Sequence, residues 1–159
     1  MDPGKALDRV AKLLLELLES EDGFVSDGMD LALCVWNKKT NELKLSGANQ
    51  PFYIIRDGEL NIIKSNKQPI GYFEDITLFT THTYQASKGD QIILFSDGYK
   101  DQFGGPKGKK FGIRRFNNVL LKYSSKSLYD QKQALLKELN EWMKKEDQVD
   151  DICIFSIKF

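Results

Sequence analysis

An apolar run that ends on an acidic residue is the feature that most constrains the fold of this chain. Ile92 to Phe95 are consecutive apolar residues, and Ser96, Asp97 and Gly98 follow them directly. A short apolar run bounded in this way is typical of a strand buried on both faces. Because glycine lets the backbone turn sharply, the pattern predicts a buried strand that delivers the Asp97 carboxylate to the rim of a sheet.

The same arrangement recurs in mirrored order near the C-terminus. Val149, Asp150 and Asp151 precede the apolar run 152–155. Two neighbouring antiparallel strands would bring Asp97 and Asp150 to one end of one sheet. Carboxylate and water oxygens suit hard cations, and the chain has no cluster of imidazole or thiolate groups, so the pattern predicts a Mg²⁺ or Mn²⁺ site.

Hydrophobic periodicity predicts helices at three places. Asp2 and Pro3 form a helix-start signal, and a helix to about Ser20 would carry one apolar stripe composed of Leu7, Val10, Leu14, Leu17 and Leu18. A helical period returns over 116–123. A further helix is expected after Ser127, which would cap it in a Ser-x-x-Asp box with Asp130.

Alternating and continuous apolar segments predict the strands. Hairpins are expected from 31–36 with 43–45 and from 52–56 with 59–63, the second closed by Asp57-Gly58, and further strands from 76–84, 91–95 and the C-terminal end. Many antiparallel strands flanked by helices predict a single α+β layered domain over residues 1–159. The C-terminal strand is expected to be central in its sheet, because its apolar character is two-sided.

Composition and charge exclude some classes of function. Lys and Arg together number 23, as do Asp and Glu, so overall charge gives no reason to expect nucleic acid as a partner. Cys34 and Cys153 each lie in an apolar run and are expected to be reduced core thiols. No signal peptide or membrane span is visible, so we expect this segment to be cytoplasmic.

Three blocks of the sequence resemble the metal-dependent serine/threonine phosphatases of the 2C type, within them the bacterial sporulation and stress-response group. The blocks are 27–34, then 47–55 with 68–71, then 96–111 with 149–152. The resemblance implies a sandwich of two antiparallel sheets between helical layers. It also implies hydrolysis of phosphoserine and phosphothreonine at a two-metal centre of Mn²⁺ or Mg²⁺, in which water attacks phosphorus in line.

The resemblance implies roles for four residues around the metal centre. Asp97 and Asp150 are expected to be metal ligands and catalytic residues, while Gly98 and Asp151 would support them from directly beside the ligands. For Asp151, the alternative is an exposed residue at the start of a strand. Asn49 and Gln50 match a turn typical of the family, with no catalytic role expected.

The family's opening metal motif, Asp-Gly-x-Gly or Asp-x-x-Gly-His-Gly, has no counterpart before the first block. Residues 27–30, Asp-Gly-Met-Asp, lack the following glycines and are interpreted as a turn and strand entry. The chain is therefore expected to be the C-terminal portion of a phosphatase domain whose metal centre is incomplete in this fragment, and to be inactive alone.

A basic cluster follows the glycine-rich loop and comprises Lys107, Lys109, Lys110, Arg114 and Arg115. It is either a solvated loop or a docking surface for a phosphorylated substrate, for which Lys107, Lys109 and Lys110 are the candidates. The P-loop pattern does not fit residues 104–112. His82, which is the sole histidine, lies among alternating strand residues, which argues against a serine–histidine nucleophile.

By resemblance, the substrate would be a phosphorylated regulator in bacterial signalling, similar to an anti-sigma-factor antagonist, and the parent protein would carry an upstream sensor domain. One alternative is a non-catalytic regulatory module that keeps the phosphatase scaffold. Another, a small-ligand sensor, has no positive sequence feature. A homodimer is expected if an unpaired sheet edge is exposed; otherwise the N-terminal helix would cover that edge.

Overall fold

Two antiparallel sheets, each with helices packed on it, organise the chain. The computed structural model describes residues 1–159 except 21–22 and 25–26. Contacts divide the chain into two compact units that alternate along the sequence: unit 1 is residues 1–52 and 62–87, and unit 2 is residues 53–61 and 88–159. A single domain over 1–159 stays a prediction. No helix in the described part of the chain has the length and apolarity needed to cross a membrane.

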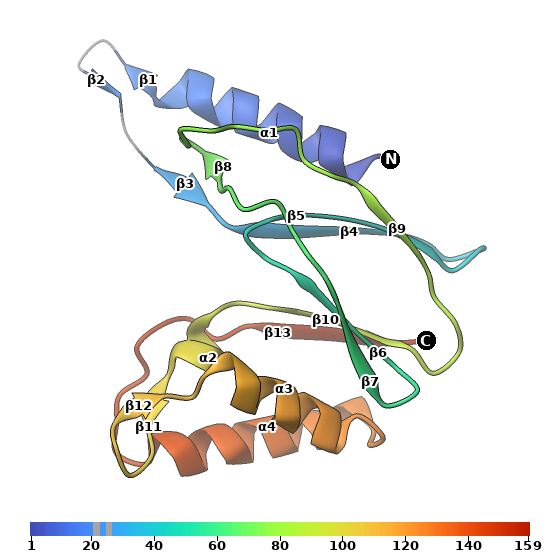
Figure 1. Ribbon diagram of the computed structural model, residues 1–159, viewed down its shortest axis with the longest axis vertical. Helices are drawn as coiled ribbons and strands as arrows, with labels where there is room; N and C mark the ends of the chain where they lie inside the picture. The colour runs from blue at the N-terminus through green and yellow to red at the C-terminus, as the bar shows by residue number, and fades with distance from the viewer. Residues whose placement is uncertain (21–22, 25–26) are drawn as a thin grey trace. The chain divides into compact units, whose positions relative to one another are not determined.

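Unit 1 is a three-stranded antiparallel sheet covered by a helix, with two small strand pairs. Its elements are α1 (Pro3–Leu18), β1 (Glu19–Ser20), β2 (Gly23–Phe24), β3 (Gly28–Met29), β4 (Leu31–Asn37), β5 (Glu42–Ala48), β8 (Ile70–Gly71) and β9 (His82–Gln85). The sheet order is β4-β5-β9, and β3 pairs with β8 and β1 with β2. Helix α1 lies along this sheet (Figure 1) and contacts β5 and β8.

The start of α1 confirms the predicted cap. Asp2 Oδ1 accepts hydrogen bonds from the Lys5 amide at 3.2 Å and from the Thr81 hydroxyl at 2.6 Å. The predicted apolar stripe is only partly right. Leu7 is buried and Leu14 packs at the edge of the core, but Val10 is 40% exposed and Leu17 is 80% exposed. The stripe is therefore narrower than the leucine spacing indicates.

The strand predicted over 76–84 is shorter, because β9 begins at His82. Side chains from elsewhere in unit 1 bind the backbone of the preceding segment. The Phe79 amide donates to Asp8 Oδ1, the Thr80 amide to Asn66 Oδ1, and the Thr77 amide to Gln68 Oε1, all at 2.8 to 2.9 Å. Since these amides already have partners, the segment gains nothing from joining a strand ladder.

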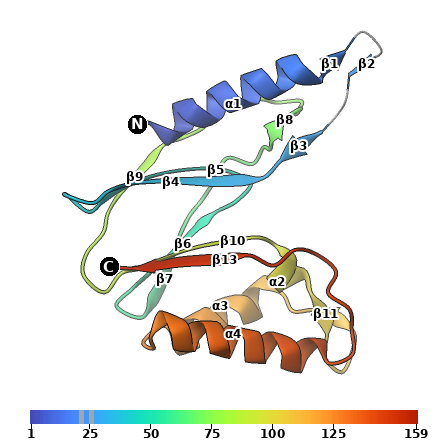
Figure 2. The same cartoon turned by 180° about the vertical axis from the view of Figure 1, so that it is seen from behind.

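Unit 2 is a sheet with two helices on one face (Figures 1 and 2). Its elements are β6 (Phe52–Arg56), β7 (Glu59–Ile63), β10 (Gln91–Phe95), α2 (Gly98–Asp101), β11 (Phe103–Gly104), β12 (Lys109–Lys110), α3 (Ile113–Tyr123), α4 (Leu128–Met143) and β13 (Ile154–Lys158). The sheet order is β13-β10-β6-β7, and β11 pairs with β12. The β6–β7 hairpin has the predicted bounds, and both turn residues, Asp57 and Gly58, have positive φ, as a type I′ turn requires.

The prediction that the C-terminal strand is central is wrong. Within the described part of the chain, β13 ends the order of the sheet, and the strands with neighbours on both sides are β10 and β6. The burial agrees, because Ile92, Ile93 and Phe95 are buried while Phe155 in β13 is 53% exposed. Apolar residues on both faces of a strand therefore do not reveal which of its edges are paired.

Aromatic side chains dominate the core of unit 2. Phe116 on α3 is fully buried, with its ring centroid 4.9 Å from that of Phe95 and 5.0 Å from that of Tyr99. Phe111 lies against Tyr99 and Trp142 in edge-on contacts. Such pairs stabilise a core beyond the area that they bury. The cluster joins β10, α2, α3 and α4 to one another, next to the segment that carries Asp97.

Of the two hydrogen bonds that the predicted capping box of α4 requires, the one accepted by the Ser127 side chain is confirmed. The Ser127 hydroxyl oxygen accepts from the Asp130 amide at 3.1 Å. The Asp130 carboxylate accepts from the Ser127 hydroxyl at 2.7 Å, whereas in a capping box it would bind the Ser127 backbone amide.

Candidate functional site

The strand pair β10–β13 determines where the predicted site lies. The strands run antiparallel, with Phe95 opposite Ile154. Asp97 follows the end of β10, and Asp150 precedes the start of β13. The two aspartates therefore lie on chain segments at the same end of one strand pair, as the sequence predicts. Both belong to unit 2.

Ser96 fastens these two segments to each other. Its amide donates to the Cys153 carbonyl at 2.9 Å, its hydroxyl donates to the Asp151 carbonyl at 2.8 Å, and its oxygen accepts from the Cys153 amide at 2.8 Å. These bonds continue the pairing beyond the regular strands. Sequence reasoning missed this role of Ser96, although its position between Phe95 and Asp97 was a usable signal.

Gly98 is required for close approach and not for a sharp turn. It is the first residue of the short helix α2, with Asp97 at the N-cap position. A Cβ on Gly98 would lie 2.5 Å from the Asp151 carbonyl oxygen and 3.0 Å from Ile152 Cγ1. Only glycine lets the Asp97 and Asp151 segments pack this closely. The structure thus shows a close approach where a sharp turn was expected, and the supporting role of Gly98 beside the metal ligands stays a prediction.

The carboxylates have different surroundings. Asp97 is half-buried, and its side chain makes no capping hydrogen bond to α2. Asp150 is exposed, and its Oδ1 accepts from the Asp151 amide at 2.7 Å. Asp151 is also exposed. Both Asp97 and Asp150 keep oxygen lone pairs for a ligand, and such oxygens fit a hard divalent cation. Among the described residues, no group of three or more His, Cys, Asp or Glu side chains is arranged to hold a metal ion.

Gln102 positions the chain that leads to Asp150. Its side chain is fully buried. Its amide nitrogen donates to the Asp147 carbonyl at 2.8 Å, and its amide oxygen accepts from the Val149 amide at 3.3 Å. The Gln102 carbonyl also accepts from Trp142 Nε1 at 3.1 Å. Sequence reasoning missed this residue, because a single glutamine after a loop signal carries no periodic pattern.

Some side chains of the basic cluster contact other residues, and others are exposed on the hairpin. Lys110 pairs with Asp101 at 3.4 Å, and the Arg115 guanidinium lies 3.9 Å from the centroid of the Trp142 ring. Lys107 and Lys109 are exposed on and beside the β11–β12 hairpin. Of the three docking candidates, Lys107 and Lys109 are therefore the two whose side chains carry no recorded ion pair.

The remaining sequence candidates have structural roles in unit 1. Gly28 and Met29 of the Asp27–Asp30 segment form β3, and Asp30 accepts from the Asn49 side chain at 2.8 Å. His82 is a ladder residue of β9 opposite Leu45.

The two cysteines are free thiols, but only one is partly buried. Cys34 is half-buried in unit 1, where burial raises the pKa of its thiol. Cys153 is exposed, so the expectation of a core thiol there is wrong. The reason is that residues 151–153 precede the regular strand.

The chain matches known proteins over its whole length. The model of the stage II sporulation protein E (SpoIIE) family matches residues 1–159. Among solved structures, the SiaA-PP2C domain of Pseudomonas aeruginosa is 25% identical with a TM-score of 0.74, over 99% of this chain and 69% of that one. The phosphatase domain of SpoIIE from Bacillus subtilis, presoaked with Mn, is 17% identical with a TM-score of 0.66, over 99% of this chain and 66% of that one.

The RsbU and RsbW domains of Rv1364c from Mycobacterium tuberculosis are 13% identical with a TM-score of 0.61, over 96% of this chain and 46% of that one. No curated protein sequence matches the chain. These structures show a 2C-type phosphatase fold, which agrees with the predicted α+β class with antiparallel sheets and helices.

Proposed function

We propose that this chain, which belongs to the stage II sporulation protein E family, supplies part of the metal centre of a serine/threonine phosphatase in bacterial signalling. The observation that carries the proposal is the β10–β13 pairing, which holds the Asp97 and Asp150 segments at one end of the sheet. Ser96, Gly98 and Gln102 fix those segments, which is the support that metal ligands need.

In this proposal, Asp97 and Asp150 are the residues that would hold Mn²⁺ or Mg²⁺. When bound, such an ion supplies charge that stabilises a phosphoryl group and makes water more acidic. Gly98 allows the two segments to approach, and the Asp151 carbonyl and amide take part in the hydrogen bonds that orient them. Asp97 is half-buried and Asp150 is exposed, so a cation held by them would stay accessible to water and substrate.

The proposed substrate is a phosphoserine or phosphothreonine on a regulatory protein similar to an anti-sigma-factor antagonist. Lys107 and Lys109 would attract its phosphorylated loop, because exposed ammonium groups favour an anionic partner. The hairpin that carries them follows α2, and α2 begins directly after Asp97. We expect the protein to act in the cytoplasm, which agrees with the free thiols of Cys34 and Cys153. An upstream sensor domain stays an expectation.

Mn²⁺ titration, followed by paramagnetic broadening of backbone amides, tests the metal assignment. We expect weak binding that broadens residues 96–98 and 150–152, and loss of that broadening in Asp97→Asn and Asp150→Asn. Asp147→Asn is the matched control, since it removes the same charge from the same exposed segment. Broadening that persists in both variants, or that is lost equally in the control, would remove the two ligands from the proposal.

Hydrolysis of an aryl phosphate tests the expectation that the 159-residue chain is inactive alone. Two carboxylates with many retained waters make a weak site for Mg²⁺ or Mn²⁺, so we expect no more turnover than in Asp97→Asn. Manganese-dependent turnover that Asp97→Asn abolishes would contradict the incomplete metal centre while supporting the enzyme. If Mn²⁺ does not bind at all, the non-catalytic regulatory module becomes the better assignment.

We also propose that a second copy of the chain pairs along β13, as a homodimer. The supporting observation is that β13 ends the order of its sheet in the described part of the chain, and unpaired strand edges are templates for pairing. The competing arrangement is a monomer in which α1 covers the edge. Sedimentation at several concentrations should show a dimer, and a species that stays at 18.2 kDa would exclude it.

A further inference from the structure

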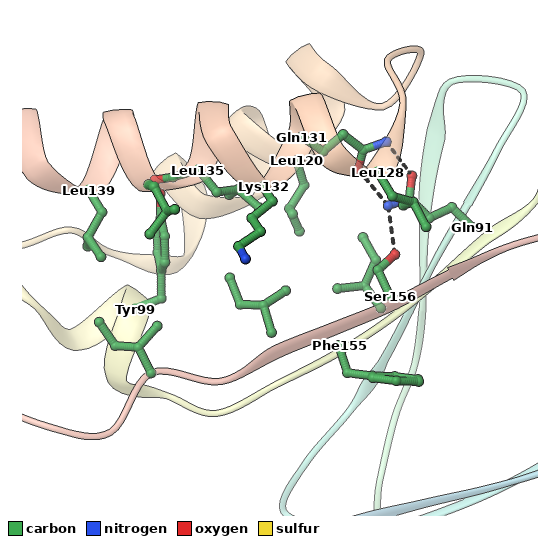
Figure 3. A pocket seen from close by; sticks show the side chains of 14 residues that line it. Gln91, Tyr99, Leu120, Leu128, Gln131, Lys132, Leu135, Leu139, Phe155 and Ser156 are labelled. Atoms are coloured by element: carbon green, nitrogen blue, oxygen red, sulfur yellow. Dashed lines mark hydrogen bonds between the residues drawn. The ribbon is translucent and has the colours of Figure 1, made fainter.

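A cavity of about 480 Å³ lies in unit 2 between helix α4 and the strands β10 and β13. Figure 3 shows its lining side chains approaching from the helix on one side and from the sheet on the other. Protein interiors leave few voids larger than a water molecule, whereas small-molecule sites measure roughly 300 to 1,000 Å³. The cavity opens at the surface, where Leu128, Lys132 and Leu136 are exposed, and its volume falls within the range of small-molecule sites.

Most of the lining is apolar. Tyr99, Leu139 and Ile154 line it, and Leu128 and Leu136 on α4 are exposed at its rim. The Phe155 ring points to the other side of β13 (Figure 3). The Tyr99 hydroxyl donates to the Leu135 carbonyl at 2.8 Å, and burial raises the pKa of Tyr99, so this hydroxyl keeps its proton. An occupant would therefore meet mainly apolar side chains along most of its length.

The polar groups at one end of the cavity bind one another. The Gln91 amide nitrogen donates to Gln131 Oε1 at 2.6 Å and to Ser156 Oγ at 2.8 Å. The Gln131 amide nitrogen donates to Gln91 Oε1 and to two backbone carbonyls, and the Ser156 hydroxyl donates to the Ile92 carbonyl. Because these donors are used within the protein, they leave nothing for the polar head of a ligand.

Lys132 is the charged residue that lines the cavity. Its side chain extends from α4 into the space above the strands (Figure 3). No ion pair of Lys132 is recorded among the described residues, whereas Lys122 and Lys137 nearby pair with Glu138 and Glu141. The cavity thus combines an apolar wall with one cation that lacks an anionic partner.

From this combination we propose that the cavity binds a small amphiphilic carboxylate, with its hydrocarbon chain between α4 and the sheet and its carboxylate on the Lys132 ammonium. The proposal is independent of the metal centre, because no lining residue is one of its ligands. An occupant would lie against Tyr99 and Ile152, which flank the Asp97–Gly98 and Asp150–Asp151 segments in the sequence.

Decanoate is a suitable probe, and 1-decanol is its uncharged match with the same chain. We expect decanoate to shift the methyl resonances of Ile152, Ile154 and Leu139 in the full 159-residue chain without metal, and to leave those of Leu45 and Ile70 in unit 1 unchanged. Lys132→Met should weaken decanoate about fivefold, the upper end for an exposed ion pair, and leave 1-decanol unaffected. Lys137→Met, on the same helix outside the cavity, should change neither.

A second variant tests the location without depending on charge. Leu136→Trp replaces a leucine side chain at the exposed rim with a bulkier indole ring and should weaken the binding of both probes. An unchanged circular dichroism spectrum of this variant would show that the chain is folded. Three results would overturn the proposal: no methyl shift with decanoate, 1-decanol binding as tightly as decanoate, or equal losses in Lys132→Met and Lys137→Met.

Discussion

Units 1 and 2 both fasten an irregular segment with a buried glutamine, but they use nearby carboxylates differently. In unit 1, Gln68 holds Thr77 through three hydrogen bonds, and the Asp8 carboxylate accepts from the Phe79 amide. In unit 2, Gln102 holds the chain before Asp150, and Asp97 makes no capping bond to its helix. A buried glutamine fastens the chain in both units. The nearby carboxylate binds a backbone amide in unit 1, whereas the Asp97 carboxylate in unit 2 makes no capping bond.

The difference teaches how a structural carboxylate is told from a candidate ligand. Asp8 fastens a segment far away in the sequence by accepting from its backbone amide, which contributes to stability. Asp97 makes no capping bond and Asp150 accepts from the adjacent Asp151 amide, so both keep oxygen lone pairs that suit a cation. The rigid aromatic core behind Asp97 also distinguishes unit 2.

The largest effect should come from the aromatic core of unit 2. Phe116→Ala removes a fully buried ring, and such truncations cost about 3 to 5 kcal/mol in the free energy of unfolding. Ile113→Ala on the same helix is the matched control, since Ile113 is exposed and should cost well under that amount. Urea unfolding measures both. Equal losses would mean that the cluster is not what supports the Asp97 segment.

Gly98→Ala should have the next largest effect, since the new Cβ meets the backbone of Asp151 and cannot be relieved by a rotamer change. We expect a loss of about 1 to 3 kcal/mol, as for overpacked sites, together with weaker Mn²⁺ binding. Gly58→Ala separates close approach from backbone strain, because nothing lies within 4 Å of its Cβ position while its φ is +78°. If Mn²⁺ binding survives in Gly98→Ala, the spacing of the two segments does not matter to the site.

Gln102→Ala and Gln68→Ala compare the two units directly. Each leaves partly buried backbone groups without that side-chain partner, which costs at most about 1 to 3 kcal/mol. Only Gln102→Ala should also weaken Mn²⁺ binding, by about 10- to 100-fold as for residues that orient metal ligands. Gln133→Ala, at an exposed position of α4, is the control for the substitution itself. If Gln68→Ala weakens Mn²⁺ equally, the contrast between the units is wrong.

The sequence predicted unit 2 better than unit 1, for a physical reason. Local patterns indicate three elements of unit 2. The apolar run 92–95 predicts β10, the Asp57-Gly58 turn predicts the β6–β7 hairpin, and the helical period around Phe116 predicts α3. The segment 76–81 also alternates, but its amides bind Asp8, Asn66 and Gln68. Partners so distant in the sequence leave no periodic signal.

The candidate site was predictable as residue types and not as geometry. Asp97 and Asp150 stand out because each flanks an apolar run, and the family resemblance supports that interpretation. The contacts of Ser96 and Gln102 depend on how residues 147–153 return to β10. The edge position of β13 was mispredicted, because an apolar run does not show which neighbouring strands are present.

The smallest effects on stability should appear when pH is lowered. In each unit, one hydrogen-bonded carboxylate has a lowered pKa. Glu138 in unit 2 accepts from Lys122 at 2.9 Å and from Tyr123 at 3.0 Å, joining α4 to α3, and the Lys122 hydrogen bond is the main reason that its pKa is lowered. Asp2 in unit 1 has a lowered pKa chiefly because of the Thr81 hydroxyl. A lowered folded-state pKa gives stability above the unfolded value, and that stability is lost as pH falls through the folded value.

We therefore expect Glu138→Gln to reduce stability at neutral pH and to flatten its loss below about pH 4.3, the ordinary value for glutamate. Hydrogen exchange should show the change at the α3–α4 amides and not in α1, while Asp2→Asn should show the converse. Glu141→Gln is the control on α4, because the Lys137–Glu141 pair is exposed and separated by 3.8 Å. The same acid profile in Glu138→Gln and the unsubstituted chain would mean that this tie contributes nothing, leaving the aromatic core as what joins the two helices.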